Sequence, residues 1–170
     1  GVIDLTRTPP GARLLRRRLL APLRNVERIR RRLDRVELFV VHTRLRSDVR
    51  AALAEVGDLE RLATRAALGE ATPRDLGALR DGLLAGRRVA KVLDAIVEPA
   101  SRETLGLADE PIDTVAELAD ELARMLVDRP PVQPKDGAIL QSGVDEELEE
   151  LSSLRGTGSE RMVELEARLR

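Results

Sequence analysis

His42 is the first residue to consider for chemistry, because it carries the only imidazole in the sequence. With Ser47 and Asp48 a few residues away, acid–base catalysis would be one role for it. A zinc site would need Cys or several carboxylates, but the chain has no Cys, and no carboxylate lies at helical spacing beside His42. A histidine that packs or faces water at a helix end is the simpler interpretation. We therefore predict that the chain contains no catalytic and no metal-ligating residue.

Nucleotide binding would need glycines whose backbone amides can reach a phosphate, as in the pattern G-x-x-x-x-G-K-[ST]. Gly82 and Gly86 lie inside a helical pattern, and neither is followed by Lys. Gly156-Thr157-Gly158 is not preceded by a strand. The sequence therefore predicts that no cofactor binds to this chain.

Charge is nearly balanced overall, but it is spread unevenly. Ten arginines lie between Arg13 and Arg35, where Glu27 and Asp34 are the only acidic residues. Residues 145–150 form an acidic block of one Asp and four Glu. Adjacent glutamates on a helix point to different faces, so this block does not predict a cation site.

The arginine-rich stretch has two interpretations. It could be a nucleic-acid face, or a solvated helix face that pairs within the molecule with the acidic block; we favour the second. The candidate residues for either face are Arg13, Arg16, Arg17, Arg28, Arg31 and Arg35.

The composition of the chain predicts that these residues lie on helices. Phe39 is the only aromatic residue, whereas sheets usually draw on Tyr, Phe and Trp. The same scarcity removes the platforms on which single-stranded nucleic acids stack. No apolar run approaches the roughly 20 residues that span a bilayer. We predict an all-α fold, an elongated, irregular, lever-like helical bundle with at most one short β-hairpin near 132–140.

Capping residues predict where the helices begin. Thr8, Asn25, Asp58, Thr72 and Asp113 are expected N-caps, and Thr8 and Thr72 each precede a proline. A short turn capped by Ser47 and an irregular stretch over 99–111 are expected between these helices. The apolar stripes expected to face inward are Val26, Ile29, Leu33, Val36 and Val40; Leu59, Leu62 and Ala66; Leu76, Leu79, Leu83, Gly86, Ala90, Leu93 and Val97; and Val115, Leu118, Leu122 and Met125.

The C-terminal part is expected to contain a turn at 134–137, a strand at 138–140 and a last helix from Asp145. Leu148, Leu151 and Leu154 would lie on its inner side, and the pattern resumes at Met162, Leu165 and Leu169 after Gly156-Thr157-Gly158. Gly82 and Gly86 would let another helix approach closely. The last helix has no C-cap, so we expect the natural chain to continue beyond Arg170.

Three groups of residues in register carry a resemblance to a known family. The first group runs from Asp4-Leu5-Thr6 through Arg13-Leu14-Leu15-Arg16 to Pro22-Leu23. The second group runs from Asp58-Leu59-Glu60-Arg61-Leu62 to Pro73-Arg74-Asp75-Leu76. The third group runs from Asp136-Gly137 through Asp145 to Leu165-Glu166. Together they resemble the core, or lever, domain of the MutS mismatch-repair proteins. Arg18 stands where that family usually has Trp, and Val144 where it usually has Tyr.

The resemblance implies a function. Residues 1–170 would be the first, outgoing part of the lever, and the helix over 145–170 would lead toward a clamp domain. The parent protein would be a DNA-dependent ATPase that binds ATP and Mg, contacts duplex DNA, forms a homodimer and works in the bacterial cytoplasm, with no membrane partner. The returning helices would pack beside these, so without them the Leu148-Leu151-Leu154 and Leu76-Leu79-Leu83 stripes should be partly bare.

Two other functions remain as alternatives to a lever. One is a stand-alone basic helical module that binds nucleic acid through the Arg13–Arg35 face. The other is a helical dimerisation domain built on the stripe from Leu76 to Val97.

Overall fold

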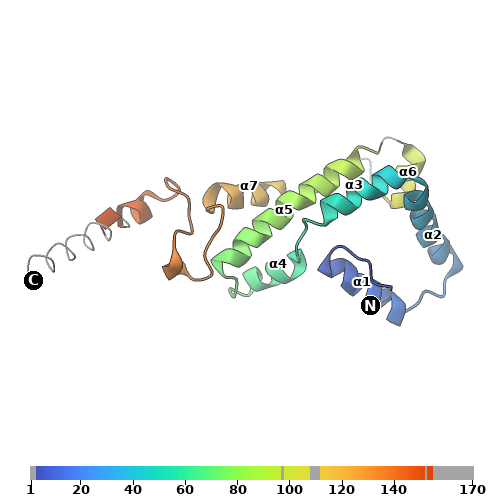
Figure 1. Cartoon of the computed structure of the whole chain (residues 1–170), viewed down its shortest axis with the longest axis horizontal. Coiled ribbons are helices and arrows are strands. Elements are labelled where there is room, and N and C mark those ends of the chain that lie inside the picture. Colours follow the sequence, from blue (N-terminus) through green and yellow to red (C-terminus); the bar gives the residue numbers. More distant parts are fainter. Residues whose placement is uncertain (1–2, 97, 108–111, 152, 155–170) are drawn as a thin grey trace, which may run out of the picture.

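The structure is a computed structural model, and it describes residues 3–96, 98–107, 112–151 and 153–154. Within these ranges the chain is helical, which confirms the predicted all-α fold (Figure 1). The elements are α1 (Pro9–Leu20), α2 (Val26–Val41), α3 (Thr43–Leu53), α4 (Leu59–Ala67), α5 (Pro73–Asp94), α6 (Pro99–Leu105), α7 (Ala116–Met125) and the 3-10 turn η1 (Pro134–Asp136). Residues 146–151 are helical as well.

The predicted capping residues start most of these helices. Thr8 accepts a hydrogen bond from the backbone N–H of Gly11, and Asn25 accepts one from that of Arg28. The side chains of Asp58, Thr72 and Asp145 cap in the same way, and Thr72 forms a full capping box with Asp75. Each cap satisfies an amide that the first helical turn leaves without a partner.

The core lies around α5. Helices α3, α4 and α7 pack against it. Leu79, Ala85 and Ala90 of α5 are buried, together with Leu62 of α4 and Ala119 of α7. The predicted inner stripe of α5 is confirmed, since none of its members from Leu76 to Leu93 is exposed. Val97 falls outside the described residues.

Glycine allows close packing at two positions of α5. A Cβ atom on Gly82 would lie 2.6 Å from Cδ2 of Leu59, which confirms the predicted close approach there. Gly86 is different, because a Cβ atom on it would meet nothing within 4 Å. The second tight position is Gly77, where a Cβ atom would lie 2.9 Å from Cδ of Pro130.

Near 132–140 the described residues form no hairpin of their own, which agrees with the prediction of at most one. Leu140 forms an isolated antiparallel bridge with Leu126, at the end of α7. The N–H of Val127 donates to the carbonyl of Ile139 (3.0 Å), and that of Gln141 donates to the carbonyl of Met125 (2.9 Å). Prolines at 130, 131 and 134 lack the N–H that a ladder needs, so the chain makes a wide loop before it pairs.

Three local predictions differ from the structure. The expected short turn at Ser47 is the eleven-residue helix α3, which packs on α5. The stretch over 99–111 contains α6, which packs on α2 and ends at Gly106 in the left-handed conformation (φ 72°). Asp113 does not cap α7 directly. Its carboxylate accepts a hydrogen bond from the N–H of Val115, whose own left-handed conformation (φ 50°) precedes the helix.

The inward face of α7 is rotated from the predicted one. Ala119 is fully buried, whereas Val115 and Leu118 are exposed. Because Ala119 has a small side chain, this face of α7 can lie close to α5, and the helices pack along it.

Two predicted inner stripes are not covered by any described segment. All five members of the α2 stripe are exposed, including Leu33 at 60%, and Leu38 is the one buried residue of that helix. Leu148, Leu151 and Leu154 are 46–63% exposed, as expected without returning helices, whereas the Leu76-Leu79-Leu83 stripe is covered. Gly156-Thr157-Gly158, Met162, Leu165 and Leu169 lie outside the described residues.

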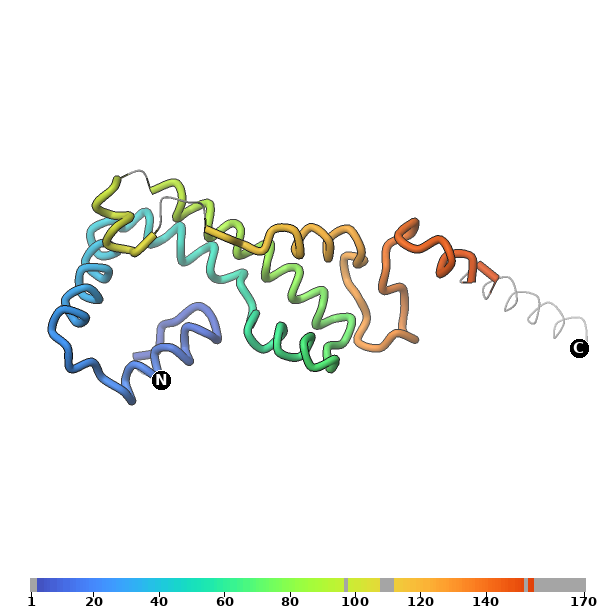
Figure 2. The backbone as a smooth tube through the Cα atoms, turned by 180° about the vertical axis from the view of Figure 1, so that it is seen from behind, coloured from blue at the N-terminus to red at the C-terminus, as the bar shows by residue number. Residues whose placement is uncertain are grey.

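The molecule is elongated, which confirms the predicted irregular bundle (Figures 1 and 2). We call α3, α4, α5, α7 and residues 126–141 the body, and α1 and α2 the arm. The arm lies at one end of the molecule, and residues 141–154 extend from the other. Among the described residues, no helix is long and apolar enough to cross a bilayer.

Candidate nucleic-acid interface

A cleft lined by arginines lies where α1 leads into α2. Its volume is about 260 Å³, and it is lined by Arg18, Leu23, Arg28, Arg31, Arg32 and Arg35. Four of these side chains come from α2 at positions 28, 31, 32 and 35. Residues three, four and seven apart share one face of a helix, so α2 places these four guanidinium groups together.

Like charges face one another across this cleft. Partial burial lowers the pKa of Arg32 from its usual value, and repulsion from Arg18 and Arg28 lowers it further. None of the described carboxylates lines the cleft. In the part of the chain that the structure describes, Arg18, Arg28, Arg31 and Arg32 form no ion pair. Arginine stays protonated at neutral pH even so, and the cleft therefore concentrates positive charge.

The side chain of Arg35 forms a hydrogen bond with α6. Its Nε donates to the backbone carbonyl of Thr104 at 2.9 Å. This hydrogen bond fixes the C-terminal end of the arginine row on α2 against the last turn of α6, in agreement with the packing of the two helices.

Arg13 has a different role from the arginines of the cleft. Its guanidinium donates to both carboxylate oxygens of Asp58, at 2.7 and 2.8 Å, and to Glu60 at 2.6 Å. These hydrogen bonds raise the pKa of Arg13, and the bond from Arg13 is the main reason that the pKa of Asp58 falls to about 2. Arg13 thereby ties α1 of the arm to the first turn of α4 in the body.

The six predicted residues therefore separate into three groups. Arg28, Arg31 and Arg35 line the cleft, Arg13 forms a salt bridge with the body, and Arg16 and Arg17 are exposed on α1 outside the cleft lining. Arg18 and Arg32 also line the cleft, although they were not among the predicted residues. The helical spacing of the α2 arginines was the available signal for Arg32, whereas only the fold brings Arg18 next to them.

The predicted pairing between the arginines and the acidic block is not found among the described residues. The two segments lie toward opposite ends of the molecule, which prevents the contact (Figure 1). The carboxylate of Glu149 in the block instead accepts a hydrogen bond from the N–H of Gly143, at 3.2 Å.

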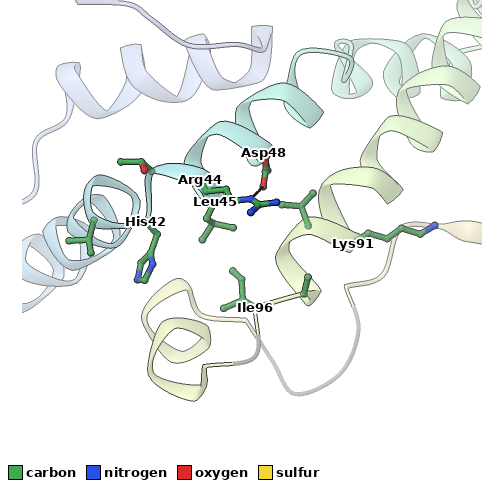
Figure 3. Close-up of a pocket in the computed structure, with 10 residues that line it drawn as sticks. His42, Arg44, Leu45, Asp48, Lys91 and Ile96 are labelled. Carbon is green, nitrogen blue, oxygen red and sulfur yellow. Dashed lines mark ion pairs between the residues drawn. The ribbon is translucent and has the colours of Figure 1, made fainter.

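His42 lines a second, wider cleft between α3 and the end of α5, of about 660 Å³ (Figure 3). Asp48 lines it as well, but its carboxylate faces Arg44 at 4.0 Å, and the imidazole of His42 points away from it. The structure thus brings His42 and Asp48 to one cleft without placing them as an acid–base pair. Within the described residues, no three side chains of His, Asp or Glu are grouped to hold a metal ion.

Comparisons with known proteins agree with this architecture. The model of the family MutS domain III matches residues 1–168. A DNA mismatch repair protein MutS from Sorangium cellulosum is 46% identical, over an alignment that covers 99% of this chain and 21% of that protein. The MutS protein of Thermus aquaticus is 41% identical over 99% of this chain and 19% of that protein. This chain belongs to the MutS domain III family.

Membership in MutS domain III places the chain as a module of a larger repair protein. The chain spans about a fifth of the length of the relatives it matches, such as 18% of the MutS protein of Salinibacter ruber, with 40% identity. Arg18 adds a positive charge to the arginine cleft at the join between α1 and α2.

Proposed function

We propose that this chain is the outgoing half of the lever of a MutS-type mismatch-repair protein. It links the regions that bind mismatched duplex DNA and the clamp region, toward which residues 145–170 lead, to an ATPase elsewhere in the protein. The lever itself has no catalytic residue. ATP and Mg bind to other parts of the parent protein, which is a homodimer of the bacterial cytoplasm.

The observation that carries this proposal is the braced helix α5. It has 22 residues, so it extends for about 33 Å at 1.5 Å per residue. Helices α3, α4 and α7 pack along it. A long helix that is supported from several sides moves as a unit, which is what the transmission of a displacement between distant sites requires.

Arg80 connects α5 to the segment after α7. Its side chain is only 8% exposed and donates to the carbonyls of Val127 (2.8 Å) and Asp128 (2.7 Å). The side chain of Gln141 donates to the carbonyls of Ala123 and Leu126, each at 2.8 Å. The chain that leads on toward residues 145–154 is thus fixed to the centre of the body.

The test of this proposal is Arg80→Met in the parent protein. We expect the ATPase to keep its basal rate and to lose most of its response to mismatched DNA, because the carbonyls at 127 and 128 lose their donor. Arg74→Met is the matched control, an exposed arginine in the first turn of the same helix.

Arg80→Lys keeps one cation at the site and should retain part of the response, which guards against a simple loss of folding in Arg80→Met. A folded Arg80→Met protein with a full response to mismatched DNA would contradict the lever function.

The rival function of a dimerisation domain has less support. It would use the stripe from Leu76 to Val97, but the described part of that stripe is covered by α3, α4 and α7.

A further inference from the structure

We infer that the arginine cleft between α1 and α2 binds the phosphate backbone of duplex DNA directly. In the part of the chain that the structure describes, five guanidinium groups and one leucine line the cleft, and no carboxylate does. Guanidinium groups bind phosphate through paired N–H donors, and a ligand with several negative charges relieves the mutual repulsion of Arg18, Arg28 and Arg32.

The size of the cleft favours a phosphate over a whole nucleotide. At about 260 Å³ it is smaller than the roughly 300–1,000 Å³ of pockets that enclose small molecules. No aromatic side chain lines it, so no base can stack there. The ligand is therefore recognised by its backbone charge and not by its bases, as in contacts that position a protein on duplex DNA.

The arginine row on α2 also has a suitable length. From Arg28 to Arg35 the helix rises about 10 Å, and one DNA strand carries a phosphate about every 3.4 Å along the duplex axis. Two or three consecutive phosphates can therefore lie along the row. Arg18 faces them from the α1 side.

A protein partner with acidic side chains is the competing occupant, and the layout of α2 speaks against it. Protein interfaces are built around apolar and aromatic cores. On α2 the apolar stripe, with Ile29, Leu33 and Val36, lies on a different face from the arginines of the cleft. A protein partner would cover that stripe, whereas the arginine face fits a polyanion.

This inference rests on the proposal that the parent protein works on DNA, but not on the lever movement. A cleft that holds phosphates would anchor the arm to the duplex while the body moves. The two proposals can therefore fail separately. Substitutions in the cleft test the anchor, and Arg80→Met tests the coupling.

The experiment measures binding of the 170-residue chain to a short, fluorescently labelled DNA duplex by anisotropy, over about 50–200 mM salt. We expect the logarithm of the association constant to fall linearly with the logarithm of the salt concentration. Arg28→Gln/Arg31→Gln should weaken binding about tenfold or more and reduce the slope by about two, since each phosphate contact contributes about 0.9. A mismatch in the duplex should change nothing.

Arg24→Gln/Arg30→Gln is the matched control. It removes the same charge, from Arg24 just before α2 and from Arg30 within α2, but neither residue lines the cleft. We expect its affinity to stay within about twofold of the unmodified chain. Circular dichroism and the unfolding midpoint of both variants should equal those of the unmodified chain.

Three results would overturn the inference. The first is no binding of duplex DNA at low salt, and the second is an equal loss in the two double variants, which would indicate a diffuse field. The third is binding of polyglutamate peptide, but not of DNA, through Arg28 and Arg31, which would assign the cleft to an acidic protein segment.

Discussion

The arm and the body contain helices with similar sequence patterns, but these helices are packed differently. Helix α2 and helix α5 each start at a side-chain cap and each carry an apolar stripe at helical spacing. In the body the stripe of α5 is covered by three helices, whereas in the arm the stripe of α2 is exposed. Local signals thus determine where a helix forms, and the neighbouring segments determine whether its apolar face contributes to stability.

The first prediction compares a leucine from the apolar stripe of one helix in each region, and it has the largest expected effect. Leu62 is 3% exposed and Leu33 is 60% exposed. Leu62→Ala should lower the free energy of unfolding by about 2–5 kcal/mol, because it leaves a cavity beside α5. Leu33→Ala should change it by less than about 0.5 kcal/mol. Urea unfolding of both variants checks this, and similar losses would show that the arm stripe is covered in solution.

The second prediction compares two glycines within the body. Gly77→Ala should destabilise the fold by about 1–3 kcal/mol, because the added carbon meets the rigid ring of Pro130. Gly86→Ala should instead stabilise it by about 0.5–1 kcal/mol, since nothing lies near the new carbon and Ala favours helix. Thermal unfolding distinguishes the two signs. A stabilising Gly77→Ala would mean that the segment at Pro130 does not press on α5.

The third prediction concerns the tie between arm and body, and its effect is the smallest. The pKa of Asp58 is lowered to about 2, chiefly by Arg13. Its charged form therefore stabilises the fold above about pH 4, the usual value for Asp, and this contribution is lost as the pH falls through about 2. Asp58→Asn keeps a capping side chain and the pair between Arg13 and Glu60 but removes the pair between Arg13 and residue 58, so its unfolding midpoint should vary less between pH 4 and pH 2.

Asp48→Asn is the control for this pH dependence, since Asp48 makes only a loose 4.0 Å pair with Arg44. It should follow the unmodified chain. If Asp58→Asn showed the same acid dependence as that chain, the tie between Arg13 and Asp58 would contribute nothing in solution.

The sequence predicted the start of each capped helix, because capping is decided by a few neighbouring residues. Thr8, Asn25, Asp58 and Thr72 all act as expected. It could not predict α3 and α6, whose packing on α5 and α2 depends on residues distant in sequence. The pairing of Leu140 with Leu126 was missed for the same reason.

The candidate site was predicted in part. Arg28, Arg31 and Arg35 could be selected because they recur along one helix, and they do line the cleft. The sequence could not distinguish Arg13 from these residues, because its partners Asp58 and Glu60 lie 45 and 47 residues further along the chain. Arg18 reaches the cleft only through the bend between α1 and α2, which charge patterning does not reveal.

Hydrogen exchange on the 170-residue chain tests most directly the claim that a rigid body carries a separately supported arm. We predict that amides of α5 from Leu79 to Ala90 exchange slowest, through near-global unfolding. Amides of α2 from Ile29 to Val40 should exchange at least about tenfold faster, through local opening. Equal protection of the two helices would contradict the account, because the arm would then belong to the same cooperative unit as the body.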